Sequence, residues 1–179
     1  VNLLGRLPGI AEGRATLRCP RPVLLPNAPV DWVGDAVGYD YTVSFELEAD
    51  SVRRGDVLFS SSDATVYLAS PKNGKLAFER EGYLNEFDYV VPAGRKVRLT
   101  FVGTNRETLL FVDGRFRQAL YPLTLGSAST DAGLAGASAD PYAASKMYYQ
   151  RTLVFPLART GRFVGRISDL SVSNYAEKY

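Results

Sequence analysis

The feature that most constrains the fold of this chain is a strict alternation of apolar and polar residues over positions 41–48. The alternating residues are Tyr41, Thr42, Val43, Ser44, Phe45, Glu46, Leu47 and Glu48. A period of two is typical of a β-strand that buries one face and exposes the other. Shorter segments of strand-like composition follow at close intervals, at 57–60, 65–69, 75–80, 86–91, 96–103, 108–112, 116–120, 152–155 and 163–175. The sequence therefore predicts an all-β chain.

Turn-forming residues separate these segments. Asn73-Gly74 and Asp113-Gly114 are dipeptides that favour tight β-hairpins, and Pro92-Ala93-Gly94 predicts another tight turn. In the last segment the alternation shifts by one residue near Ser168-Asp169, which predicts a β-bulge. Many short strands at this spacing indicate a β-sandwich or a β-barrel.

The first 40 residues differ in composition from the rest. They are rich in Pro and Gly, which break helices and central strands alike. We predict that residues 1–40 are a lead-in packed on the sandwich, with one or two short strands such as Ala15–Arg18. Residues 41–179 then form the β-sandwich itself, within a single structural domain. A run of small residues over 126–144 predicts a long loop.

Charge and residue types exclude several classes of function. The 21 basic and 19 acidic residues are interspersed, so no basic patch is present for nucleic acid or for an anionic membrane surface. No apolar run approaches the roughly 18 residues of a membrane-spanning helix. The chain has no His and a single Cys, Cys19, which excludes His-based triads, His metal sites and intrachain disulfides. We expect no nucleic-acid partner and no membrane insertion.

Six motifs follow one another in a fixed order. They are 74–83 (Gly-Lys-Leu-Ala-Phe-Glu-Arg-Glu-Gly-Tyr), Phe87-Asp88-Tyr89-x-x-Pro92-x-Gly94, Leu99-Thr100-Phe101-x-Gly103, Leu110-Phe111-Val112-Asp113-Gly114, 153–157 (Leu-Val-Phe-Pro-Leu) and 165–170 (Gly-Arg-Ile-Ser-Asp-Leu). Over roughly residues 41–174 the set resembles the C-terminal laminin-G-like, or concanavalin A-like, domain of bacterial β-N-acetylhexosaminidases of glycoside hydrolase family 20. The resemblance implies an antiparallel jelly-roll β-sandwich of the concanavalin A-like lectin and glucanase type.

The same resemblance implies a function. Such a domain is a non-catalytic accessory module of a secreted, periplasmic or cell-surface bacterial glycosidase, and we expect it to bind a glycan, with N-acetylhexosamine as the first candidate. The alternative is a purely structural domain that packs against the catalytic barrel of the same parent chain. Family 20 enzymes use an adjacent Asp-Glu pair, and this sequence contains no such dipeptide. We therefore expect no enzymatic activity from the chain, and a barrel located elsewhere in the parent.

Glu46, Glu48 and Asp50 invite a catalytic interpretation. Alternation places the three carboxylates on one strand face, with neighbours about 6.6 Å apart. True glycosidases of the concanavalin A-like fold carry Glu-x-Asp-x-x-Glu, whereas the spacing here is Glu-x-Glu-x-Asp with no Trp after it to form a sugar platform. We interpret the three residues as a solvated outer face.

A sugar site needs an aromatic ring for the apolar face of a pyranose and polar groups for its hydroxyls. The candidates are Trp32, Arg80, Tyr83, Asp140, Tyr142, Tyr148 and Tyr149. Trp32, the only tryptophan, lies in the lead-in and is a candidate for a platform on which a sugar stacks. Its alternative role is to fill the core. Arg80 and Tyr83 flank a predicted turn at Glu81-Gly82, and their alternative role is to close that hairpin by packing and an ion pair. The other candidates lie in or just after the long loop and alternatively fold it back on the sandwich.

Calcium is the one cofactor for which ligands can be named. Related laminin-G domains commonly hold this ion with oxygen atoms from adjacent loops, and Asp50, Asp56 and Asp113 are the candidate donors. The chain has no local run of ligands like that of an EF-hand loop. Apart from calcium, we expect no cofactor.

Overall fold

The structure is a computed structural model that describes residues 16–19, 23–25, 36–120, 153–157 and 159–177. These residues form strands, turns and loops, and none of them is helical. The prediction of an all-β chain is therefore confirmed for this part of the sequence. No helix in the same ranges is long and apolar enough to cross a membrane.

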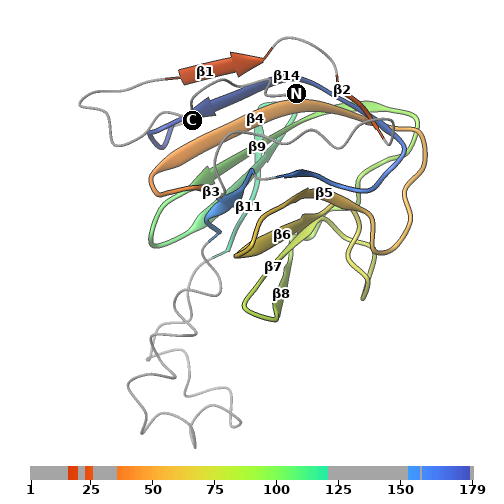
Figure 1. The fold of residues 1–179 in the computed structure, drawn as a ribbon, viewed down its shortest axis with the longest axis horizontal. Helices are drawn as coiled ribbons and strands as arrows, with labels where there is room; N and C mark the ends of the chain where they lie inside the picture. The colour runs from red at the N-terminus through yellow and green to blue at the C-terminus, as the bar shows by residue number, and fades with distance from the viewer. Residues whose placement is uncertain (1–15, 20–22, 26–35, 121–152, 158, 178–179) are drawn as a thin grey trace, which may run out of the picture.

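The larger of the two main sheets has seven strands. They are β1 (Thr16–Cys19), β2 (Val23–Leu25), β4 (Tyr41–Ala49), β9 (Lys96–Gly103), β10 (Thr108–Val112), β11 (Arg115–Leu120) and β14 (Gly165–Ser173). Their order is β1-β14-β4-β9-β10-β11, with β2 also paired to β14, and every pair is antiparallel. The long strands β4 and β14 lie side by side in the upper layer of Figure 1.

The smaller main sheet has five strands and lies below the first in Figure 1. Its strands are β5 (Val57–Ser60), β6 (Ala64–Tyr67), β7 (Ala77–Arg80), β8 (Tyr83–Glu86) and β13 (Arg159–Thr160), in the order β13-β5-β6-β7-β8. Four of them form a meander in which each strand pairs with the next along the chain. A separate pair is formed by β3 (Ala36–Val37) and β12 (Phe155–Pro156). Two facing antiparallel sheets make a β-sandwich, as predicted.

The core lies between the two sheets, and the apolar residues at every second position of β4 all belong to it. Five residues of this strand have no exposed surface: Tyr41, Val43, Phe45, Leu47 and Ala49. Phe45 meets Phe59 of the smaller sheet edge to face, with ring centroids 5.3 Å apart. Phe155 contacts both Phe59 and Phe101, at 5.4 Å each. Aromatic pairs of this geometry contribute about 0.5–1.5 kcal/mol beyond the burial of their area.

Two of the expected hairpin turns are present with the backbone that they require. Asp113 and Gly114 have φ of 50° and 76° and connect β10 to β11. Glu81 and Gly82 have φ of 50° and 80° and connect β7 to β8. Two successive residues with positive φ form the turn whose twist matches that of paired strands. The bulge is also confirmed, because the pairing of β14 with β4 shifts between Ser168 and Ser171.

Two expectations about the strands need correction. Asn73-Gly74 does not form a two-residue hairpin but belongs to a longer loop. The loop is closed by hydrogen bonds from the N–H of Ser70 to the carbonyl of Lys75 and from the N–H of Gly74 to the carbonyl of Ser70. The strand expected at 86–91 is wrong, because the tight turn at 81–82 returns the chain at once and the strand runs from Tyr83 to Glu86. Phe87 beyond it is fully buried, which explains why the pattern of this segment predicts a strand.

The lead-in contributes strands to both the larger sheet and the two-stranded pair. Thr16–Cys19 pairs with β14, close to the expected Ala15–Arg18, and β2 pairs with β14 further along. The structure describes only short parts of the first 35 residues. A division of the chain at residue 40 therefore stays a prediction.

Gly103 gives a direct test of core packing. A Cβ atom at this position would overlap the ring of Tyr41, which lies directly across from it and donates a buried hydrogen bond to the carbonyl of Leu153. We expect Gly103→Ala to lower the free energy of unfolding by about 1–3 kcal/mol, because the ring is held on all sides. Denaturant unfolding measures the change. Gly38→Ala is the control, since a Cβ there meets open space, and equal stabilities of the two variants would contradict the packing argument.

Candidate functional site

A polar pocket lies at one end of the smaller sheet. In an antiparallel meander, the β5–β6 loop and the β7–β8 turn fall at the same end of the sheet, which brings 61–63 close to 81–82. The space between them measures about 310 Å³ and is lined by Ser61, Ser62, Asp63, Ala64, Thr65, Glu79, Glu81 and Gly82. Small-molecule pockets commonly measure about 300–1,000 Å³, so this one has room for a ligand the size of a monosaccharide.

Short-range hydrogen bonds shape the loop side of the pocket. The backbone N–H of Ser61 donates to the carbonyl of Ala64 at 2.9 Å. The Ser61 hydroxyl accepts from the N–H groups of Asp63 and Ala64, at 3.2 and 3.3 Å. Arg80 joins this loop to β7 through an ion pair, with its Nε 3.0 Å from Oδ2 of Asp63. The two hairpins that border the pocket are therefore fastened to each other.

An aromatic ring and a carboxylate lie beside the pocket on the outer face of the same sheet. Thr65 pairs directly with Glu79, and Tyr67 lies two residues further along, on the same face. The Tyr67 hydroxyl donates a hydrogen bond to Glu79. Burial, then the charge of Glu79, then this hydrogen bond raise the pKa of Tyr67 above its usual value. The Tyr67 hydroxyl thus contacts Glu79, which lines the pocket, although Tyr67 itself is not part of the lining.

Two of the seven predicted sugar-contacting residues lie within the described part of the chain. Arg80 has a side chain only 13% exposed, paired with Asp63 and donating from Nη1 to the Tyr39 hydroxyl at 3.0 Å. Tyr83 is 50% exposed and pairs across the turn with Arg80, but neither residue lines the pocket. The ion pair of Arg80 therefore joins β7 to the β5–β6 loop and does not close the hairpin between Arg80 and Tyr83. A sugar contact by either residue stays a prediction.

The remaining five candidates fall outside the residues that the structure describes. They are Trp32, Asp140, Tyr142, Tyr148 and Tyr149. Their part in sugar binding stays a prediction as well.

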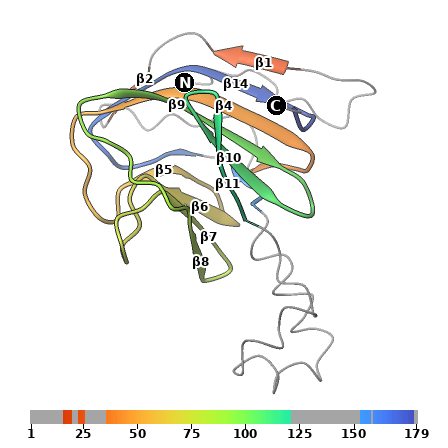
Figure 2. The same ribbon diagram turned by 180° about the vertical axis from the view of Figure 1, so that it is seen from behind.

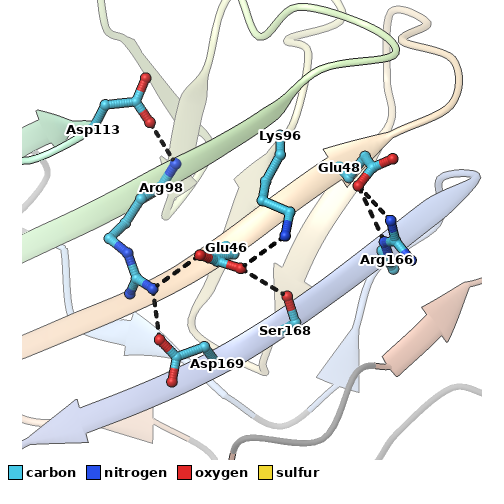
Figure 3. A network of polar contacts seen from close by, with 8 residues as sticks. All are labelled: Glu46, Glu48, Lys96, Arg98, Asp113, Arg166, Ser168 and Asp169. Carbon is cyan, nitrogen blue, oxygen red and sulfur yellow. Dashed lines mark hydrogen bonds and ion pairs between the residues drawn. The ribbon is translucent and has the colours of Figure 1, made fainter.

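The carboxylates of β4 are engaged in ion pairs on the outer face of the larger sheet (Figure 3). Glu46 lies 3.3 Å from both Lys96 and Arg98 of β9. Glu48 accepts from Arg166 of β14 at 2.7 Å. Arg98 also reaches Asp169, at 2.5 Å, so its guanidinium spans β9, β4 and β14. The expected placement of Glu46 and Glu48 on the outer face is confirmed.

This network does not suit a glycosidase acid. Burial alone would raise the pKa of Glu46, but hydrogen bonds and charges from Lys96 and Arg98 outweigh it, so the pKa lies below its usual value. A general acid needs the opposite shift, because it must hold its proton near neutral pH. Glu48, the other carboxylate of the pair, is held by Arg166. The geometry therefore favours a structural role for both.

The three candidate calcium ligands are not brought together. Asp56 accepts from the backbone N–H of Arg53 at 2.8 Å, and Asp113 accepts from the N–H of Arg98 at 2.9 Å. Asp50 lies exposed just after β4. In the described residues, no group of three or more His, Cys, Asp or Glu is placed to hold a metal ion. Calcium binding by Asp50, Asp56 and Asp113 stays a prediction.

Sequence reasoning did not find the pocket, although a signal for it exists. The run Ser61-Ser62-Asp63 separates β5 from β6, and the sequence predicts a turn at Glu81-Gly82. Consecutive strands of a meander place alternate turns at the same end of the sheet. Combining these points would have brought the serine-rich loop beside Glu79 and Glu81.

The ion pairs of Glu46 should make the stability of the fold depend on pH. We expect Glu46→Gln to lower the free energy of unfolding by about 1 kcal/mol at neutral pH, the upper range for exposed pairs. Because the folded-state pKa is lowered, the contribution is present above the ordinary carboxyl pKa and is lost as the pH falls through the lowered value. Urea unfolding at several pH values measures this difference.

Glu107→Gln is the matched control, since Glu107 lies on the same sheet side without an ion pair among the described residues. A difference for Glu46→Gln that persists unchanged at acid pH would contradict the electrostatic explanation.

Comparison with known proteins bears on the fold. Neither protein-family models nor curated proteins gave a match. Among solved structures, a galectin from Caenorhabditis elegans aligns with a TM-score of 0.50 and 12% identity, over 84% of this chain and 94% of the galectin. Domain 4 of an extracellular GH43 arabinanase from Geobacillus stearothermophilus, in complex with arabinotriose, aligns with a TM-score of 0.49 and 13% identity, over 91% and 68%. The fold of the chain is thus an antiparallel jelly-roll β-sandwich of the lectin type.

Proposed function

We propose that the chain is a non-catalytic accessory module of a secreted glycosidase and that it binds carbohydrate on the outer face of the smaller sheet. The pocket bordered by Thr65, Glu79 and Glu81, with Tyr67 beside it, is the observation that carries this proposal. A lectin-type β-sandwich supports it at the level of the fold.

The chemistry of the pocket matches that of a sugar. Hydroxyl groups of a pyranose donate well to carboxylates, and Glu79 and Glu81 both line the pocket. Ser61, Ser62 and Thr65 supply hydroxyls that exchange hydrogen bonds with other sugar hydroxyls. In this proposal the partly buried ring of Tyr67, next to the pocket lining, packs against the apolar face of the sugar. Shallow sites of this kind bury little area, so we expect dissociation constants in the micromolar to millimolar range, roughly −4 to −8 kcal/mol.

The parent enzyme in this proposal is a bacterial β-N-acetylhexosaminidase. Its support is the ordered set of motifs between residues 74 and 170 that resembles the C-terminal domain of those enzymes. N-acetylhexosamine-containing glycans are accordingly the first ligands to test, and the catalytic barrel of the parent chain is the expected covalent neighbour. The alternative remains a structural domain that packs on that barrel without touching sugar.

Glycan-array screening followed by calorimetry tests the proposal, starting with N-acetylglucosamine- and N-acetylgalactosamine-terminated oligosaccharides. We expect Tyr67→Ala to weaken binding by about 2- to 12-fold, the equivalent of losing a ring contact of about 0.5–1.5 kcal/mol. Tyr67→Phe keeps the ring and serves as the matched control, with affinity close to that of the wild type. Glu79→Gln should weaken binding as well, because it removes the charged acceptor.

The same measurements separate the competing sites. Loss of binding in Trp32→Ala or Tyr148→Ala, with Tyr67→Ala unaffected, would move the sugar site away from the smaller sheet. An array without hits would favour the structural alternative.

A further inference from the structure

A second hollow lies on the opposite side of the molecule, on the outer face of the larger sheet. It measures about 650 Å³ and crosses the strands β9, β10 and β11, which are labelled in Figure 2. Its floor is apolar and consists of Val102, Leu109, Phe111 and Phe116. We call this hollow the β9–β11 groove.

The apolar floor differs from the rest of the outer face of the larger sheet, which is polar. Outer-face positions of β4 and of the first half of β9 carry Ser, Thr, Glu, Lys and Arg. Leu109 pairs with Val102, and Phe111 with Phe116, so four apolar side chains come together where polar ones are expected. Phe116 is 59% exposed and meets Phe111 edge to face at 5.7 Å. Val102 and Phe111 are themselves buried, so the accessible apolar surface of the cluster comes from Phe116 and the partly exposed Leu109. Exposed apolar surface next to a hollow is a feature of interaction sites on soluble proteins.

The C-terminal segment forms one wall of the groove and is fixed in place. Thr42 of β4 is nearly fully buried, and its hydroxyl donates to the carbonyl of Tyr175 at 2.8 Å. The same hydroxyl accepts from the backbone N–H of Glu177 at 2.9 Å. The wall formed by residues 175–177 is therefore anchored to the sheet and preformed, which lowers the entropic cost of binding.

The rim carries negative charge. Asp40, Glu107 and Glu177 line the groove, and among the residues that the structure describes no Lys or Arg lines it. Within the ranges that the structure covers, none of these three carboxylates lies within ion-pair distance of a basic side chain, in contrast to Glu46 and Glu48 on the same sheet. An apolar floor and an uncompensated acidic rim together favour an occupant with both apolar and cationic groups.

We propose that the β9–β11 groove docks a polypeptide segment of a partner domain or protein that presents a Lys or Arg next to a large apolar side chain. The apolar side chain packs on Phe116 and Leu109, and the cation pairs with Glu107, Asp40 or Glu177. A neutral sugar is a poor match for the floor, because the side chains of Val102 and Leu109 cannot form hydrogen bonds with its hydroxyl groups. The proposal is independent of the sugar site, which lies on the other sheet.

Amide chemical shifts of the isotope-labelled domain test this docking. The probes are two synthetic peptides, acetyl-Lys-Phe-Lys-Leu-amide and its charge-reversed counterpart acetyl-Glu-Phe-Glu-Leu-amide. We expect the cationic peptide to shift amides near Glu107, Leu109 and Phe116, and the anionic one to leave them unchanged. Raising the salt concentration from about 0.05 to about 0.5 M should weaken the cationic response several-fold, since exposed charges are then screened.

Two variants and one control localise the effect. Phe116→Ser should abolish the shifts, and Glu107→Gln should reduce them several-fold. Val90→Ser is the matched control, because Val90 is also 58% exposed but lies outside the groove, and it should respond like the wild type. Equal responses to both peptides, or groove shifts produced by an oligosaccharide instead, would overturn the proposal. So would shifts at the groove that depend on protein concentration alone, which would identify a second copy as the occupant.

Discussion

The inward face of β4 is the constraint on which the rest of this structure depends. Its five core residues are completely buried, and the strand pairs with β14 on one side and with β9 on the other. A slip of one residue would bury Glu46 and Glu48 and expose Phe45, so the burial of this strand determines its register. Because β9 and β14 pair with β4, the positions of the outer-face residues on these three strands follow from its register.

The ion-pair network shows how a local irregularity contributes to that outer face. Asp169 has φ of 48° and sits in the bulge of β14, where the pairing with β4 shifts. The bulge turns its carboxylate toward Arg98, two strands away, so one guanidinium links three strands (Figure 3). The larger sheet thus has a polar half with matched charges and an apolar half around Phe116 with unmatched ones. The two halves therefore differ in what they can bind.

Much of the fold could be predicted from the sequence because its strands alternate and its turns are chemically explicit. The bounds of β5, β9 and β10 agree with those expected from composition. The strand expected after residue 86 failed because Phe87 is buried in a loop, which periodicity cannot distinguish from burial in a strand. The pocket at Glu79 and the groove at Phe116 each combine residues from several strands. The sequence shows which residue types these strands carry. It does not show which strands lie side by side, and that order decides which residues meet.

The pairing of β1 with β14 has a mechanical consequence. Thr16, the first residue of β1, lies across from Ser173, the last residue of β14. The start of β1 and the end of β14 therefore lie side by side at the same end of the sheet. Tension applied between the start of β1 and the end of β14 acts perpendicular to the two strands and opens the hydrogen bonds between them one after another. Strands pulled along their length would instead load all their bonds at once. We expect such tension to break first the contacts of Thr42 with residues 175–177 and then the ladder between β1 and β14.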